Sequence, residues 1–383
     1  MVVIRDAVHG SIELNALEEK ILDTPVVQRL RGLRQLATAY LVFPSAQHTR
    51  FEHSLGTLYL ASRLCMHLGF SQERAQAIRL AALLHDVGHG AFSHLSEPFL
   101  KRALRKNHEE LGVVKLRECG IFDELEKQGV GQKDLEKLLL SKSRDSALIT
   151  GDLGTDRLDY LLRDALFCGV AYSVVDGQRL LETLKFERGS LVVGEKGRVP
   201  AESLLVSRYL MFNSVYFHHA VRISYEMLRK AIGNALEGGK ISIRDVADGT
   251  DYELMHALLG QCNPLAMRVA QRKLYKRAFS IDVGKSDELR GFFKNRDNAE
   301  KELNIEFSRV CGFDDFVLCL PLSHTQPLSV EISREGKIES LAKSSPLARA
   351  LEGENAEREF IAACSAENRP KLERAAKKFF AAL

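Results

Sequence analysis

Histidines and aspartates recur in this chain in an order that can bind a divalent metal ion. His53 opens an apolar helical pattern, the pair His85 and Asp86 ends an Ala- and Leu-rich stretch about thirty residues later, and Asp156 begins a third helical pattern. Imidazole and carboxylate together suit Fe, Mn, Ni, Co or Zn, and burying such groups without a partner is costly. The pattern therefore predicts one metal site formed by His53, His85, Asp86 and Asp156, with positions left open for water and substrate.

Each of these histidines, taken alone, is better explained as a hydrogen-bonded core residue than as a metal ligand. The set as a whole is not, because a polar pair stands at the end of an apolar stretch. That pair is followed by Gly88, His89 and Gly90, and then by a further histidine. We therefore prefer a metal site to a purely structural role.

The residues around this set suit phosphate chemistry. Side chains that could contact phosphoryl oxygens or transfer a proton at neutral pH are His89, His94, His108 and Glu97. Arginines that could neutralise phosphates through their planar forks are Arg50, Arg157 and Arg208. Each arginine taken singly is as often part of a surface salt bridge. Helical spacing places Tyr160 and Asp164 near the face of Asp156, where Tyr160 could contact a sugar or base.

The composition is that of a soluble globular protein. The chain has 383 residues, of which 45% are hydrophobic and 27% charged. A net charge of +3 gives no general attraction to nucleic acid or membranes, and no apolar run approaches the roughly 20 residues that span a bilayer. The seven cysteines, without a CxxC motif, predict buried free thiols in a reducing compartment. With no apolar signal region at the N-terminus, we expect a cytoplasmic protein without membrane or nucleic-acid partners.

Mostly helical elements are expected to position these residues. Helical patterns cover 16–22, 26–36, 54–68, 72–85, 95–119, 133–142, 156–166 and 201–235. A β-hairpin is expected from the strand-like runs at 184–186 and 191–193. Further strand-like runs lie at 278–283, 316–320 and 328–332. The sequence thus predicts a mainly α protein with small β-hairpins: a helical domain over residues 1–238 and a smaller α+β lobe over 239–383, with an oligomerisation or regulatory role.

The sequence resembles the HD-domain deoxynucleoside triphosphate triphosphohydrolases, and in particular the catalytic core of the SAM-and-HD-domain dNTPase. The similar segments follow the same order over roughly residues 1–235: they are 6–14, 23–36, 43–56, 85–94, 155–160 and 215–218. A fainter similarity lies at 272–276. A His-Asp pair alone is a weak motif, whereas this ordered series is specific. The resemblance covers the catalytic core, and we expect no SAM domain in this chain.

The resemblance implies a helical HD domain that hydrolyses a dNTP at its α-phosphate to deoxynucleoside and inorganic triphosphate. It assigns the metal ligands to the four residues named first, and phosphate contact and acid–base catalysis to His89, His94, His108 and Glu97. The nucleotide pocket that it implies is lined by Gln35, Leu36, Arg50, Arg157, Tyr160, Asp164, Arg208 and Tyr216. One transition metal is the implied cofactor, and Mg²⁺ could accompany the nucleotide.

Oligomers of this family also bind a regulatory nucleotide at subunit contacts. The matching positions and their plausible partners are Asp23, Gln28, Arg31, Arg179, Arg272 and Lys276. The resemblance thus implies a homo-oligomer, a dimer or tetramer. Without the resemblance, the arginine-rich stretch at 26–36 would be interpreted as a solvated helix face.

Three functions fit these residues. In the first, water activated by the metal attacks the α-phosphorus of a dNTP, and His94 or His89 protonates the leaving 5′-oxygen. In the second, the site cleaves nucleoside monophosphates or phosphodiesters, including cyclic nucleotides. In the third, the chain is a non-catalytic nucleotide sensor. Inorganic triphosphate as a product identifies the first, and binding without turnover identifies the third.

Overall fold

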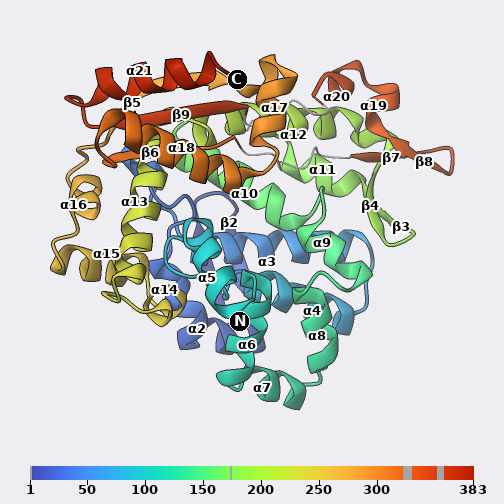
Figure 1. Cartoon of the computed structure of the whole chain (residues 1–383). Coiled ribbons are helices and arrows are strands. Elements are labelled where there is room, and N and C mark those ends of the chain that lie inside the picture. Colours follow the sequence, from blue (N-terminus) through green and yellow to red (C-terminus); the bar gives the residue numbers. More distant parts are fainter. Residues whose placement is uncertain (1, 173–174, 322–329, 352–357) are drawn as a thin grey trace. The chain divides into compact units, whose positions relative to one another are not determined.

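The computed structural model of the chain is mainly α-helical, with small β-sheets, as the sequence predicted (Figure 1). It describes residues 2–172, 175–321, 330–351 and 358–383. Its contacts divide the chain into two compact units. The first comprises residues 1–211, 242–254 and 328–352, and the second 212–241, 255–327 and 353–383.

The first unit holds every predicted metal ligand. Its strands are β1 (Val2–Asp6), β2 (Gly10–Leu14), β3 (Leu184–Glu187), β4 (Ser190–Gly194), β7 (Glu331–Arg334) and β8 (Lys337–Ser340). Its helices are α1 (Ala16–Leu22), α2 (Pro25–Gln28), α3 (Arg50–His67), α4 (Gln72–Leu84), α5 (Glu97–Leu104), α6 (His108–Glu118), α7 (Ile121–Lys127), α8 (Gln132–Leu139), α9 (Ala147–Thr150), α10 (Thr155–Cys168), α11 (Gly177–Thr183), α12 (Arg198–Met211), α14 (Ile243–Asp248), α19 (Leu341–Ser344) and α20 (Pro346–Leu351). Helix α15 (Asp251–Gly260) begins in this unit.

Helix α3 is the centre of the metal-site region, because it packs against both α4 and α10. It begins at a capping box, in which Thr49 and Glu52 satisfy each other's backbone N–H groups. The second half of α4 is enclosed on all sides, and its residues 80–84 are fully buried. The first half of α4 is partly exposed.

Two small sheets belong to the first unit. Strands β1 and β2 form an antiparallel hairpin, and a second sheet has the order β3-β4-β7-β8. The β3–β4 hairpin was predicted from its alternating pattern and is confirmed. Strand β7 then pairs in parallel with β4, aligning Ile332 with Val193.

The second unit is an α+β assembly. Its elements are a π-helical turn at Phe212–Tyr216, α13 (His219–Glu237), α16 (Pro264–Ala270), α17 (Asp287–Phe293), α18 (Arg296–Cys311), α21 (Arg369–Phe380) and the strands β5 (Lys276–Asp282), β6 (Phe316–Cys319) and β9 (Glu359–Cys364). The antiparallel sheet has the order β5-β9-β6, and α21 packs on it beside α18 (Figure 1). Phenylalanines dominate the core between them, including Phe293, Phe307 and Phe360.

Some predicted elements differ from the observed ones. The helix expected over 26–36 is a short α-helix followed by a 3₁₀ turn, Arg29–Gly32, and then irregular chain. The helical stretch expected over 95–119 is interrupted between α5 and α6, and that over 201–235 is interrupted by the π-helical turn. The run predicted at 328–332 lies partly outside the described residues, and β7 covers its end. Cys119 and Cys262 are exposed, so the expectation of buried thiols is wrong for these two.

Among the described residues, no helix combines the length and apolar character required to cross a membrane. The division into domains 1–238 and 239–383 stays a prediction.

Candidate metal centre and nucleotide site

The turn after α4 presents His85 and Asp86 in a fixed orientation. The His85 Nδ1 atom lies 2.8 Å from the carbonyl oxygen of Ala82, so Nδ1–H donates to it and Nε2 keeps its lone pair. That Nε2 atom is buried and has no hydrogen-bond partner among the described residues. A buried acceptor left unsatisfied is unusual, and it is accounted for if the lone pair binds a cation.

The four predicted ligands meet around this atom. From His85 Nε2 the distances are 3.4 Å to an Asp86 oxygen and 3.8 Å to an Asp156 oxygen. From His53 Nε2 they are 3.9 Å to Asp86 and 3.0 Å to Asp156. Ligand atoms about 2.1 Å from one ion lie roughly 3 to 4 Å apart. The donor set and its spacing therefore fit a single divalent transition metal.

His53 is held from behind by Asp159. Its Nδ1 atom lies 2.7 Å from Asp159 Oδ2, which leaves Nε2 facing Asp156. Burial by itself lowers the pKa of His53, but the hydrogen bonds to Asp156 and Asp159 outweigh it and raise the pKa to about 10. The surrounding carboxylates thus favour positive charge at this position, as either a proton or a metal ion.

Asp86 is ionised although it is buried. Burial acts to raise its pKa, but the charge of Arg50 and the neighbouring histidines hold the pKa well below its usual value. Arg50 Nη1 donates to Asp86 Oδ2 at 2.6 Å, and its Nε donates to Ser93 Oγ. Arg50 therefore lies beside the predicted metal ligands, and its guanidinium is paired with one of their carboxylates.

The predicted phosphate and acid–base residues form one cluster. Glu97 accepts from His108 Nδ1 at 2.9 Å and from His94 Nδ1 at 3.0 Å, one on each carboxylate oxygen. Burial acts to raise the pKa of Glu97, but these two histidines lower it far below its usual value. Within this cluster, His89 lies beside the metal ligands, with Nε2 3.3 Å from Asp86 Oδ1.

Gly88 makes the close approach of α6 possible. A Cβ atom at this position would lie 1.8 Å from the His108 carbonyl oxygen and 2.3 Å from the Gly112 nitrogen. Gly90 likewise makes room for another part of the chain, since a Cβ atom at this position would lie 2.6 Å from the Val246 carbonyl oxygen.

His89, His94 and His108 are also close enough to be considered as a second metal site. The rings of His89 and His108 are stacked, however, with centroids 4.1 Å apart and planes 12° from parallel. A nitrogen lone pair lies in its ring plane, and two separate parallel planes cannot both contain one ion. The cluster is therefore better suited to phosphate contact and proton transfer than to holding a second metal.

The residues predicted to line the nucleotide pocket differ in burial and in hydrogen-bond partners. Arg157 pairs with Asp152 at the start of α10. Asp164 is buried, and its Oδ1 lies 2.7 Å from His48 Nε2. The Gln35 side-chain oxygen is buried without a hydrogen-bond partner among the described residues. The remaining first-unit members are the half-buried Leu36 and Tyr160 and the buried Arg208 on α12. Tyr216 belongs to the second unit.

The predicted regulatory residues are divided between the units. Asp23, Gln28 and Arg31 lie around α2, where Arg31 Nε donates to Gln28 Oε1 at 2.8 Å. Arg31 also lies over the ring of Phe51, 3.6 Å from its centroid. Arg179 is exposed on α11 in the first unit, and Arg272 and Lys276 are exposed in the second. The regulatory role of all six stays a prediction.

The sequence interpretation missed Asp159 and the residues that hold it. The spacing of Asp159 and Arg163 on α10 is that of an i, i+4 ion pair, which could have indicated them. No local signal identified His9 as a further partner, because it lies far away in the sequence.

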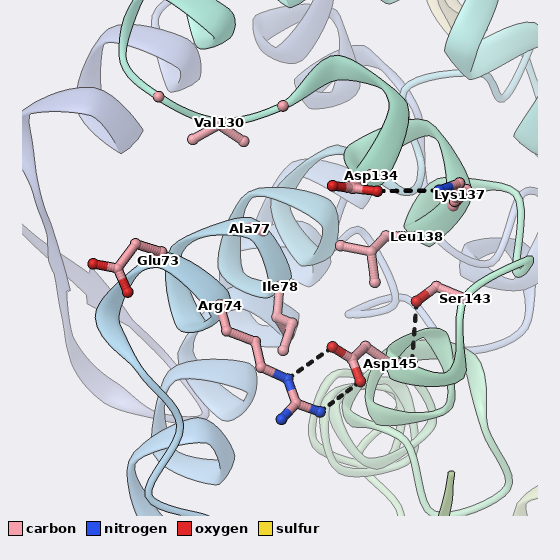
Figure 2. Close-up of a pocket in the computed structure, with 12 residues that line it drawn as sticks. Glu73, Arg74, Ala77, Ile78, Val130, Asp134, Lys137, Leu138, Ser143 and Asp145 are labelled. Carbon is pink, nitrogen blue, oxygen red and sulfur yellow. Dashed lines mark hydrogen bonds and ion pairs between the residues drawn. The ribbon is translucent and has the colours of Figure 1, made fainter.

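A separate hollow of about 340 Å³ lies between α4 and α8, and none of the predicted site residues lines it (Figure 2). Arg74 donates to both carboxylate oxygens of Asp145 across it, at 2.8 and 2.7 Å. On its rim, Lys137 pairs with Asp134. These two ion pairs leave little uncompensated charge in the hollow. Substitutions in the hollow can therefore serve as controls for substitutions at the metal centre.

Comparison with known proteins supports an HD-domain identity. The HD domain family matches residues 50–164, and the HD associated region matches residues 175–382. An uncharacterized protein of Methanocaldococcus jannaschii is 35% identical over 357 residues, which cover 92% of this chain and 76% of that protein. The crystal structure of a hypothetical protein from Aquifex aeolicus is similar to this one, with a TM-score of 0.81 and 29% sequence identity. The match covers 98% of this chain and 99% of the Aquifex aeolicus chain.

A relative with a named activity is matched over a smaller share of its own length. The deoxynucleoside triphosphate triphosphohydrolase SAMHD1 homolog of Dictyostelium discoideum is 32% identical over 263 residues. The match covers 63% of this chain and 50% of that protein, so the chain spans about half the length of this relative. The order of metal-site residues, their convergence in one unit and these matches lead to one conclusion: the chain belongs to the HD-domain phosphohydrolases, and carries an HD domain followed by an HD associated region.

Proposed function

We propose that this HD-domain phosphohydrolase hydrolyses dNTPs at the α-phosphate, releasing deoxynucleoside and inorganic triphosphate. One observation carries the proposal: Asp86 Oδ1 lies 3.4 Å from His85 Nε2 and 3.3 Å from His89 Nε2. It therefore joins the metal ligands directly to the histidine cluster. A substrate phosphate at this junction would reach both groups.

The metal would be held by His53, His85, Asp86 and Asp156, one transition ion of the Fe, Mn, Ni, Co or Zn class. When bound, such an ion polarises a phosphoryl oxygen and lowers the pKa of a coordinated water molecule. The chain's own contribution is to hold both aspartates ionised. Before a metal binds, Arg50 does this for Asp86, and the hydrogen bond from His53 lowers the pKa of Asp156 against the effect of burial.

His94 is the better candidate for protonating the leaving 5′-oxygen. Its side chain is 62% exposed, whereas the side chain of His89 is 1% exposed. Glu97 accepts from His94 Nδ1 and so directs Nε2 outward. Burial and the charge of Arg50 lower the pKa of both histidines, but Glu97 acts to raise the pKa of His94, whereas the pKa of His89 is held well below its usual value. His89 is therefore suited to contact rather than to proton donation.

The remaining parts of the proposal rest on the resemblance. Within the first unit, the nucleotide would be lined by Gln35, Leu36, Arg157, Tyr160, Asp164 and Arg208, with Mg²⁺ on its phosphates. A homo-oligomer, a regulatory nucleotide and a cytoplasmic location complete it. The buried Gln35 side-chain oxygen, which has no hydrogen-bond partner in the described part of the chain, supports a polar ligand near this residue.

Metal analysis and product identification test the proposal. The purified chain, supplied with Mn²⁺ or Fe²⁺, should release inorganic triphosphate from at least one of the four dNTPs. Asp86→Ala and Asp86→Asn should lose both metal and turnover, whereas Asp134→Ala, on the exposed face of α8, should keep both. Monophosphate products, or binding without turnover, would replace the proposal with one of its alternatives. Full turnover by both Asp86 variants would refute the assigned site.

A further inference from the structure

The hairpin β1–β2 lies outside the parts of the chain that match the HD domain and the HD associated region. Its turn nevertheless reaches the residue behind a metal ligand. His9, in this turn, places Nε2 2.6 Å from Asp159 Oδ1. Asp159 in turn accepts from His53 Nδ1, so one carboxylate connects the hairpin to the metal centre.

Asp159 is fully buried and its hydrogen-bonding capacity is filled. Oδ1 faces His9 Nε2 and accepts from Arg163 Nη2 at 2.9 Å. Oδ2 faces His53 Nδ1 and accepts from Arg163 Nε at 2.9 Å. Both lone pairs of each oxygen are therefore directed at N–H groups, an arrangement that only a carboxylate can provide.

Arg163 connects Asp159 to the hairpin, because it also donates hydrogen bonds to Asp6. It is fully buried, and donates to Asp6 through Nη1 at 2.7 Å and through Nη2 at 3.2 Å. Asp6 also accepts the backbone N–H of His9 at 2.8 Å, which fixes the turn. Hairpin and helix α10 thus form a closed ring of hydrogen bonds through His9, Asp159, Arg163 and Asp6.

The packing against α3 is consistent with this ring. The ring of His9 stacks on Tyr59, with centroids 5.0 Å apart. On the same helix, a Cβ atom at Gly56 would lie 1.9 Å from Asp159 Oδ1 and 2.4 Å from Arg163 Nη2. Glycine at this position is therefore needed for the carboxylate to approach His53.

The charges explain what the ring could do. Asp6 and Asp159 are two carboxylates and Arg163 is one guanidinium, so carboxylates outnumber guanidinium groups beside His53. A carboxylate that accepts from the far nitrogen of a metal-binding imidazole fixes its tautomer and raises its basicity, and loss of such a partner typically costs about 10- to 100-fold in metal affinity.

We propose that His9, together with Asp6, Asp159 and Arg163, forms a positioning network that orients His53 and strengthens metal binding. The N-terminal hairpin is then part of the metal centre and not merely an extension that precedes it. The proposal rests on the metal site of the proposed function, but not on the identity of the substrate.

The test measures Mn²⁺ binding to the full chain by competition with a fluorescent chelator. We expect His9→Ala to raise the dissociation constant about tenfold or more. His9→Gln keeps an N–H donor near the position of Nε2 and should restore binding to within about threefold of wild type. Arg5→Ala, on the exposed side of the same hairpin, should leave binding unchanged, because the Arg5 guanidinium donates to Ser11 and not to the network.

Asp159→Asn has a matched control in the hollow of Figure 2. Asp145 accepts hydrogen bonds from Nε and Nη2 of Arg74, and Asp159 accepts hydrogen bonds from the same two atoms of Arg163. Asp159→Asn should weaken Mn²⁺ binding by about tenfold or more, and Asp145→Asn should not. Thermal unfolding of the metal-free variants would separate a loss of fold from a loss of metal affinity.

The outcomes distinguish this proposal from the proposed function. Equal dissociation constants for His9→Ala and wild type would overturn the network, whatever the substrate. So would failure of His9→Gln to bind better than His9→Ala in chains of equal stability. Tight wild-type binding without dNTP turnover would defeat only the proposed function, and a wild-type chain that binds no Mn²⁺ would overturn both.

Discussion

At the scale of single residues, Glu97 does two tasks with one carboxylate. Each oxygen accepts from a different histidine, and the lowered pKa keeps both oxygens as acceptors throughout the neutral range. Glu97→Gln would offer one acceptor and one N–H group, so His94 or His108 would lose its orientation. We expect kcat for the preferred dNTP to fall about 10- to 100-fold, because positioned acid–base groups contribute on this order.

The measurement for Glu97→Gln pairs steady-state kinetics with Mn²⁺ affinity. Metal affinity should stay within about twofold of wild type, since Glu97 is not a predicted ligand. Glu109→Gln, next to His108 in the first turn of α6, is the control and should keep wild-type kinetics. An unchanged kcat in Glu97→Gln would mean that the histidine pair does not take part in turnover.

The residue types at the metal centre could be predicted from the sequence, whereas their supporting partners could not. His85 and Asp86 stand out because polar residues end an apolar stretch, and this contrast is local. The bond between His9 and Asp159 joins residues 150 positions apart, and neither residue departs from its local pattern. Only the folded chain shows that these two meet.

At the scale of elements, the contact between α6 and the turn after α4 depends on Gly88. A Cβ atom there would overlap the His108 carbonyl oxygen, and backbone cannot move aside as a flexible side chain can. We expect Gly88→Ala to destabilise the chain by about 1–3 kcal/mol, the usual cost of overpacking, and to lower kcat by displacing His108.

Gly291→Ala is the control for this prediction. Gly291 lies inside α17, and a Cβ atom added to it would meet nothing within 4 Å. Alanine there should be neutral or stabilise the helix by up to about 1 kcal/mol. Urea unfolding of both variants measures the difference, and equal stability of Gly88→Ala and wild type would contradict the close approach.

Asp251, the first residue of α15, gives a prediction for pH. Its buried carboxylate accepts the backbone N–H groups of Arg34 at 3.0 Å and Phe92 at 2.6 Å, and burial raises its pKa to about 6. The folded chain therefore holds this proton more tightly than the unfolded chain, whose carboxyl group titrates near pH 3.9. The contribution of Asp251 to stability is then largest below pH 4 and falls as the pH rises to about 6.

A shift of about two pH units corresponds to roughly 3 kcal/mol. The difference in unfolding free energy between wild type and Asp251→Asn should shrink by up to this amount between about pH 4 and pH 6, and then stay constant. Urea unfolding across this range measures it. Asp297→Asn, at an exposed position in α18, should show no such change with pH, and a pH-independent difference for Asp251→Asn would contradict the prediction.

Elements defined by local signals were predicted best. Asn15 and Glu18 form the capping box that starts α1, and the β3–β4 hairpin follows its alternating pattern. The helix expected over 26–36 failed because distant partners compete for the backbone of its second half. The Gln35 N–H donates to the His48 carbonyl, and the Arg34 N–H donates to Asp251. Helical periodicity cannot reveal such competition.

At the scale of the whole molecule, the predicted boundary at residue 238 follows a local composition signal. Gly238, Gly239 and Lys240 are exposed, as expected of a connecting segment. The first compact unit nevertheless includes residues 242–254 and 328–352 from the other side of that segment. The Val246 carbonyl accepts the Ala91 N–H near the metal centre, and β7 extends the sheet of β4. Long-range pairing of this kind has no signature in composition, which is why the fold class was predictable and the distribution of contacts was not.

These contacts predict the result of cutting the chain at the exposed loop. A protease site inserted between Gly238 and Gly239, cleaved after folding, should leave residues 1–238 and 239–383 associated under native conditions, because α14 and the β7–β8 strands remain packed within the first unit. Size-exclusion chromatography with Mn²⁺ affinity measures this, and the fragments should separate only in denaturant. An uncut sample carrying the same insertion controls for the insertion itself. Separation into two folded fragments in native buffer would instead support independent domains on either side of residue 238, as the composition alone suggested.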